Sequence, residues 1–226
     1  MKATTFGILL HRIAYSESSV ITTFYTKDAG IQKFIFQGAK KKSNVLFPLS
    51  VCELIYYKRP DSELGKLTEA TPLFPLNGLM SSPIKASIAF FLVDVLKQTL
   101  QTNQSEERVF DFLTSQIQLL NEAEKVQFFP IQFLAKYTDF IGISPQLMLE
   151  PLFFNLMEGE FHSDVRHGEV ELSGEICRQL LKTFEGELPD KAYQKEVFEQ
   201  LIHYYKIHSP RFNVDESLQI IEAILH

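Results

Sequence analysis

The sequence predicts an α+β protein with two domains, a five-stranded OB-type β-barrel over residues 1–80 and an α-helical domain over residues 81–226. Two changes near residue 80 support this. The hydrophobic period changes from the two-residue period of strands to the 3.6-residue period of helices. The net charge also changes, from +4 before that point to −10 after it, within a chain of net charge −6.

Short segments rich in β-branched and aromatic residues are the expected strands of the barrel. They read "TTFGILLHRI", "SVITTFYT", "IQKFIFQG", "VCELIYYKR" and "GKLTEATPLF". Asp28 and Gly30 mark one expected hairpin turn, and Pro60 and Gly65 mark another. Five strands joined by loops of uneven length are typical of an OB-type barrel.

The rest of the chain reads mainly as helices. Pro83 follows Ser82 as a first-turn proline, and the spacing predicts a helix over about 83–102. Further helical stripes occur in "ERVFDFLTSQIQLLNEA", "FFPIQFLAKYTDFIG", "KAYQKEVFEQLIHYYKIH" and "DESLQIIEAIL". Gly142 is expected to end the second of these. The segment at about 150–173 has neither period, which predicts an irregular but ordered excursion between helices.

Several features indicate a cytoplasmic protein. No apolar run reaches the roughly 18 residues that a membrane span needs, and Arg12 interrupts the start too early for a signal peptide. The two cysteines, Cys52 and Cys177, form no CxxC pair, so both are expected to be reduced and buried.

Catalytic motifs are missing from the sequence. In "GAKKKS", Lys41 stands where a phosphate-binding P-loop needs its second glycine, so no nucleotide site is expected. The side chains that could offer nitrogen or sulfur to a metal are not spaced along the chain as in known metal sites. They are His162, His167, Cys177, His203 and His208. A hydrolase or nucleotidyl transferase built on the segment 158–171 stays an alternative, which would need a metal.

Basic loops and aromatic strands in the barrel favour DNA binding, because lysines neutralise phosphates and exposed rings stack on bases. The expected phosphate contacts are Arg12, Lys33, Lys40, Lys41, Lys42, Lys58, Arg59 and Lys66, with Lys27 as a further cation. The expected stacking rings are Phe24, Phe36 and Tyr57. For each ring, packing in the core is the alternative. If the basic loops are only solvated, the protein is a scaffold with a structural barrel and a partner-binding helical domain.

The order of these segments resembles the RecO family of recombinational repair proteins over essentially the full length. The segments "GILLHRIAYSESSVITTFYTKDAG", "IFQGAKKKSN", "LFPLSVCELIYYK" and "LGKLTEA" are similar to the family's amino-terminal domain. "FLAKYTDFIGISPQL" and "YYKIHSPRFNVDESLQIIEAIL" are similar to helices of its carboxy-terminal part. Matching family members also place basic residues after a Gly-Ala pair, which makes Lys40, Lys41 and Lys42 the first choice for phosphate contact.

The resemblance implies an OB fold followed by a helical domain. It also implies a non-enzymatic recombination mediator in the cytoplasm that binds single- and double-stranded DNA and anneals complementary strands. Such a protein works with RecR to load RecA onto strands coated by single-stranded-DNA-binding protein.

The sequence departs from the family pattern in two places. Many relatives carry a four-cysteine zinc motif, but "PLFFNLMEGEFHSDVRHGEVEL" has no cysteine, so no zinc or other cofactor is expected. Burial of Phe153, Phe154, Leu156 and Phe161 is expected to replace the metal. Some relatives place an arginine around the position of Gln132, in a pocket that receives the acidic, Phe-ending tail of single-stranded-DNA-binding protein. Here the cation for that tail is expected from Lys97, Arg108 or Lys136.

Overall fold

The computed structural model describes residues 2–37, 46–59, 62–100, 105–164, 171–210 and 212–225. The chain forms two compact units, Met1–Glu124 and Lys125–His226. The first unit contains the barrel and the first helices, and the domain boundary at residue 80 stays a prediction. In the part of the chain that the structure describes, no helix is both long and apolar enough to cross a membrane.

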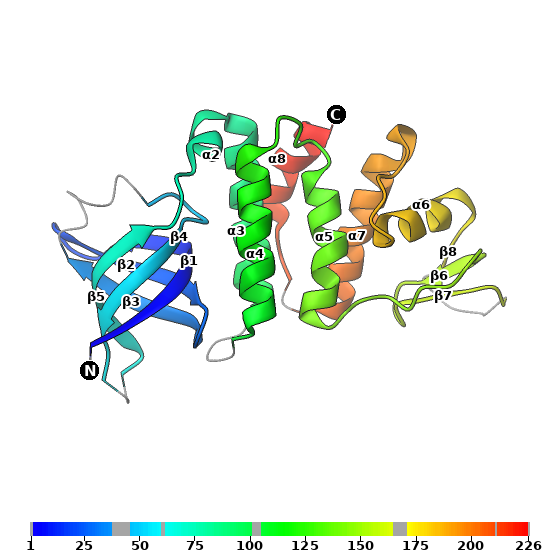
Figure 1. The fold of residues 1–226 in the computed structure, drawn as a ribbon. Coiled ribbons are helices and arrows are strands. Elements are labelled where there is room, and N and C mark those ends of the chain that lie inside the picture. The colour runs from blue at the N-terminus through cyan, green and yellow to red at the C-terminus, as the bar shows by residue number, and fades with distance from the viewer. Residues whose placement is uncertain are drawn as a thin grey trace. The chain divides into compact units, whose positions relative to one another are not determined.

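Five strands close into a barrel in the first unit (Figure 1), which confirms the predicted fold class. They are β1 (Lys2–Ala14), β2 (Ser19–Thr26), β3 (Gly30–Gln37), β4 (Val51–Tyr57) and β5 (Leu64–Pro72). Their order around the barrel is β1-β2-β3-β5-β4. β3 and β5 pair in parallel, and the other neighbours pair antiparallel. Gly30 has a φ of 65°, as the predicted turn after β2 requires.

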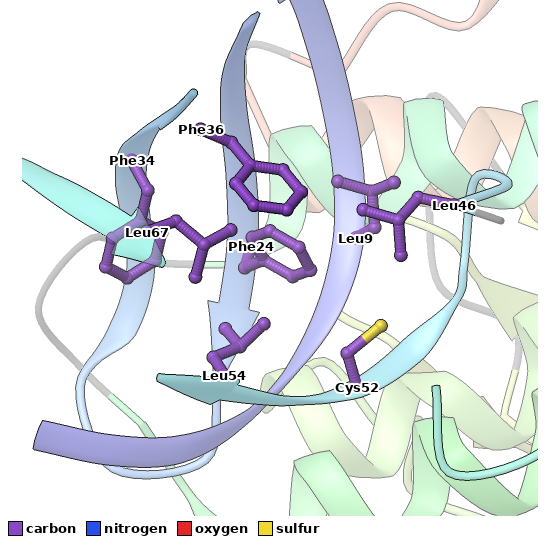
Figure 2. Close-up of a cluster of buried hydrophobic side chains, with 8 residues drawn as sticks. All are labelled: Leu9, Phe24, Phe34, Phe36, Leu46, Cys52, Leu54 and Leu67. Atoms are coloured by element: carbon purple, nitrogen blue, oxygen red, sulfur yellow. The ribbon is translucent and has the colours of Figure 1, made fainter. Parts of the chain in front are cut away.

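The barrel is filled by side chains that alternate inward along the strands (Figure 2). The buried cluster comprises Leu9, Phe24, Phe34, Phe36, Leu46, Cys52, Leu54 and Leu67. Two glycines make room for it. A Cβ on Gly7 would lie 2.7 Å from Leu54 Cδ1, and a Cβ on Gly65 would lie 2.7 Å from Phe34 Cδ1. Large core rings therefore require these two positions to have no side chain.

Three helices complete the first unit: α2 (Asn77–Ser81), α3 (Pro83–Thr99) and α4 (Glu107–Glu122). Pro83 lies in the first turn of α3, and the Ser82 side chain accepts a hydrogen bond from the backbone N–H of Lys85. Both features match the predicted helix start. The helix ends at Thr99, followed by Leu100 in an extended conformation, so it is about three residues shorter than the predicted end near 102. The short helix α2 was not predicted.

The second unit combines helices with a small sheet. The helices are α5 (Phe129–Ile141), α6 (Gly174–Phe184), α7 (Gln194–His208) and α8 (Asp215–Leu225), and a 3-10 turn, Lys191–Tyr193, precedes α7. The strands β6 (Phe153–Asn155), β7 (Glu160–His162) and β8 (Glu171–Ser173) form a sheet in the order β7-β6-β8. Gly142 ends α5 with a φ of 74°, as predicted. The sheet and α6 were not predicted, because strands of three residues are too short to show an alternating pattern.

Aromatic rings hold this small sheet against the helices. Phe154 stacks on Phe161 with ring centroids 4.2 Å apart. Its ring also lies beside that of Tyr204 on α7, with centroids 5.7 Å apart. Phe154, Phe161 and Leu156 are buried, as predicted. That this burial holds the excursion in place of a metal stays a prediction. Phe153 is half-buried on the other face of β6.

Candidate nucleic-acid interface

One row of outward-facing residues runs around the barrel from strand to strand. It comprises Lys2, Tyr57, Lys66, Ile35, Ile21 and Ile13, in which each residue pairs with the next by strand register. We name this set the outer row. Its members are exposed or half-exposed, whereas the strand neighbours Phe34 and Leu67 point into the core.

The outer row and the adjacent Lys33 bring together three of the residues predicted from sequence. Lys66 pairs with both Tyr57 and Ile35, and Lys33 lies two residues from Ile35 on the same face of β3. Neighbouring strands are about 4.8 Å apart, so these side chains share one small surface. Lysines beside an exposed ring and apolar side chains suit a single strand, which offers phosphates and the flat faces of bases. Lys2 was not predicted as a contact.

The acidic residues of the neighbouring strands lie farther along the barrel. Glu53 is four residues from Tyr57 on β4, and Glu69 is three residues from Lys66 on β5. At about 3.3 Å per residue, these separations are roughly 13 Å and 10 Å. Both exceed the screening length of about 8 Å at physiological salt. Lys2 and Lys66 are thus separated from these two carboxylates, whereas the exposed Glu63 directly precedes Leu64, the register partner of Lys33.

Two of the three predicted stacking rings are wrong. Phe24 and Phe36 are 0% and 2% exposed and lie inside the barrel (Figure 2). Strand alternation points both rings inward, so neither offers a face to a base. Tyr57 is 48% exposed on the outer row and stays a prediction.

The remaining predicted cations of the barrel lie near its ends. Lys58 and Arg59 directly follow Tyr57, and the Lys58 Nζ donates a hydrogen bond to the Gln32 side chain. Arg59 is exposed. Arg12 pairs with Thr22 on the hairpin of β1 and β2.

That hairpin also carries residues that the sequence reasoning missed. Residues 11–18 are all exposed, and Tyr15 reaches 61% exposure. Its polar run "HRIAYSESS" after the buried run "GILL" is the signal that marks a projecting hairpin. Gln37, the last residue of β3, pairs with Ser19 at the hairpin base. The segment with Lys40, Lys41 and Lys42 continues the chain from there and lies outside the described residues.

Lys27 has a different role from the one expected. Its Nζ lies 2.8 Å from Glu107 Oε1 and 3.3 Å from Asp111 Oδ1, both on α4. The hydrogen bond that the Lys27 ammonium donates to Glu107 is the main cause that raises the pKa of Lys27. The ammonium also lies 5.9 Å from the centroid of the Phe110 ring. Lys27 therefore binds the barrel to α4 within the first unit.

The three cations expected to receive an acidic tail are distributed over both units. Lys97 on α3 lies 3.7 Å from Asp94, and Arg108 is exposed on α4. Lys136 is exposed on α5 in the second unit. The tail site stays a prediction.

A cavity of about 450 Å³ opens in the first unit between the end of β5 and α2. It is lined by Ser50, Pro72, Leu73, Phe74, Pro75, Leu76, Asn77 and Met80. This lining includes no charged side chain, so the cavity suits apolar groups better than a phosphate or a carboxylate.

Metal binding finds little support in the side chains. Among the described residues, no group of three or more His, Cys, Asp or Glu side chains could hold a metal ion. Both cysteines are buried and unbonded to each other. Burial raises the pKa of Cys52 to about 12 and that of Cys177 to about 11. Both thiols therefore stay protonated at neutral pH, and a metal binds the thiolate.

We expect the purified protein to contain no stoichiometric zinc. It should also unfold at the same temperature with and without a chelator, because buried rings rather than thiolates hold the small sheet. Elemental analysis and thermal unfolding in chelator check this. One tightly held zinc per chain, with a lower unfolding temperature after its removal, would contradict the expectation.

Comparison with known proteins agrees with this architecture. Residues 1–76 match the family model of the recombination protein O N terminal domain, and residues 80–150 match that of its C terminal domain. The chain is 28% identical to the DNA repair protein RecO of Phocaeicola vulgatus, over 97% of this chain and 98% of the relative. It is 25% identical to that of Christiangramia forsetii, with the same coverage. With a closed barrel, helices and two family models in chain order, this protein belongs to the RecO family of DNA repair proteins.

Proposed function

We propose that this protein is a recombination mediator that binds single- and double-stranded DNA through the outer row and the adjacent lysines of the barrel. The observation that carries the proposal is the register that places Lys2, Lys66 and Tyr57 side by side, with Lys33 on the same face. Phosphate contacts and stacking read no base sequence. Such a surface suits a protein that must act on any damaged sequence.

Annealing and RecA loading are the proposed activities. Two complementary strands repel each other through their phosphates, and a cationic surface that holds one strand lowers that barrier. Family membership supports RecR, RecA and the tail of single-stranded-DNA-binding protein as partners, and the cytoplasm as the compartment. The relatives' common name as DNA repair proteins and the lack of a catalytic motif support a role without enzyme activity.

Binding of fluorescent single-stranded DNA across a salt series tests the proposal, together with annealing of two labelled complementary strands. We expect measurable affinity at low salt that weakens linearly on a double-logarithmic plot, because phosphate contacts release counterions. The protein should also accelerate annealing over the strands alone. No affinity at low salt would instead establish the scaffold alternative.

Tyr57→Ala is expected to weaken single-strand binding by about 1–3 kcal/mol, the usual value of one base stacked on an aromatic side chain. Tyr57→Phe keeps the ring and should bind like wild type, which makes it the matched control. Thermal unfolding of both should stay close to wild type, because the side chain is half-exposed. Equal affinity of the alanine variant and wild type would remove Tyr57 from the interface.

A labelled acidic peptide ending in Phe is expected to bind residues 81–226. Lys97→Ala, Arg108→Ala or Lys136→Ala should weaken it about tenfold, because each removes a possible charge-assisted hydrogen bond. The barrel variant Lys33→Ala/Lys66→Ala is the control and should bind the peptide normally. Fluorescence anisotropy measures both. Wild-type affinity in all three single variants, or loss in the barrel variant, would place the tail elsewhere.

A further inference from the structure

A buried pair of titratable side chains lies in the small sheet of the second unit. His162 Nε2 on β7 is 3.3 Å from Glu171 Oε1 on β8, and the two side chains are only 3% and 13% exposed. At this distance the atoms are in ion-pair contact, but neither makes a well-aligned hydrogen bond to any described group. Buried polar atoms are nearly always paired, so this arrangement needs an explanation.

The hydrogen bond of His162 Nδ1 shows that Nε2 is the ring nitrogen without a proton when the ring is neutral. His162 Nδ1 lies 2.8 Å from the backbone oxygen of Asp164. A carbonyl oxygen only accepts hydrogen bonds, so Nδ1 carries a hydrogen and donates it. In a neutral ring, Nε2 then has only a lone pair. It would face a carboxylate oxygen of Glu171, which also has only lone pairs.

We propose that His162 and Glu171 share one buried proton, and that this proton-dependent pair fastens β7 to β8 across β6. His162 pairs in register with Phe153, and Glu171 pairs with Asn155, so the contact crosses the central strand. The Phe153 ring stacks on the imidazole with centroids 5.6 Å apart and covers it. Strands of three residues form few ladder hydrogen bonds, so this contact adds to the hold that the buried rings have on the sheet.

Among the described residues, the charged side chains closest to the pair along the strands and at the start of α6 are acidic. Glu160 of β7 and Glu171 are both register partners of Asn155, so they lie on one face of the sheet. Asp164 follows β7 with an exposed side chain, and Glu175 lies in the first turn of α6. Glu175 is bound by Gln179 and Arg178, which lower its pKa. The residues of β6 in this contact are uncharged.

The pair makes the sheet sensitive to pH. The closed sheet holds a proton that the open sheet releases, so the stability of the sheet falls as the pH rises. Loss of the proton leaves a buried carboxylate facing a lone pair, and the sheet opens.

Hydrogen exchange of the full-length protein between pH 6.5 and 8.5 tests this, with rates corrected for the intrinsic effect of pH. In wild type, protection of β6, β7 and β8 should fall about tenfold or more over this range, while that of β2 and β3 serves as the reference. Glu171→Ala should lose about tenfold or more already at pH 7, because it leaves a buried nitrogen unpaired.

Glu171→Gln is the decisive variant, because its amide N–H donates to the Nε2 lone pair without titrating. It should keep the sheet protected and make the protection independent of pH. Glu160→Gln is the matched control and should retain the wild-type pH dependence. If Glu171→Ala fails to fold, the glutamine variant and the wild-type pH series still decide.

Three results would overturn the proposal. Wild-type protection that does not change with pH, or a Glu171→Gln variant as open as the alanine variant, would show that no shared proton holds the sheet. Protection that is lost in chelator, with one bound metal per chain, would show that a metal occupies the place of the proton.

Discussion

Replacement of Lys33, Lys40, Lys41, Lys42 and Lys66 by alanine is expected to flatten the salt dependence of single-strand binding. Each phosphate contact contributes roughly 0.7 to the slope of log affinity against log salt, so five contacts should lower the slope by about 3.5. Affinity at low salt should fall for every DNA sequence alike, because phosphate contacts carry no base information. Fluorescence anisotropy across a salt series measures both effects.

Two partial variants separate the contributions. Lys40→Ala/Lys41→Ala/Lys42→Ala alone should lower the slope by about 2, and Lys33→Ala/Lys66→Ala alone by about 1.4. Lys66 on the outer row and the adjacent Lys33 are both exposed, so their removal should change stability by no more than about 0.5 kcal/mol. The triple variant tests the three lysines that follow Gln37 in the sequence.

Lys191→Ala/Lys195→Ala is the charge-matched control for Lys33→Ala/Lys66→Ala, because it also removes two exposed lysines, here from the second unit. It removes two positive charges far along the chain from the barrel and should keep the wild-type slope. If the five-lysine variant also keeps the wild-type affinity and slope, the lysines are only solvated. The DNA contacts must then be sought at Arg12, Lys58 and Arg59.

Phe24→Ala is expected to lower the free energy of unfolding by about 3–5 kcal/mol, the usual cost of removing a buried aromatic side chain. The Phe24 ring is fully buried and meets Phe34 edge-on, with centroids 6.2 Å apart. Its removal leaves a cavity in the center of the barrel. Urea denaturation measures the loss, and the DNA affinity of the protein that remains folded should stay close to wild type.

Tyr57→Ala is the control for Phe24→Ala, because the two variants are expected to have opposite effects on stability and DNA affinity. It should lose DNA affinity and keep its stability, whereas Phe24→Ala should lose stability and keep affinity. A Phe24→Ala variant that unfolds like wild type and binds DNA poorly would mean that this ring lies on the DNA-binding surface. That outcome would restore the stacking interpretation of the strand aromatics.

Local patterns in the sequence were enough to predict much of the fold. The five strand segments, the turn at Gly30 and the helix end at Gly142 depend on residues within a few positions of each other. Chain geometry acts at that range: glycine tolerates a positive φ, and side chains alternate along a strand. The sheet of the second unit escaped prediction because its short strands depend on each other for their existence.

The candidate DNA interface shows where such local patterns stop. The sequence predicted that Lys33, Lys66 and Tyr57 are strand or loop residues of a basic barrel, but not that they are neighbours. Their adjacency follows from the parallel pairing of β3 with β5 and the antiparallel pairing of β4 with β5. These pairings join residues far apart in the chain, which no periodicity encodes. Alternation likewise predicts that some rings point inward, but not which ones. Closure of the barrel determines which face of each strand is shielded from water. For that reason only the tertiary structure decided that Phe24 and Phe36 are core residues and that Tyr57 is a surface residue.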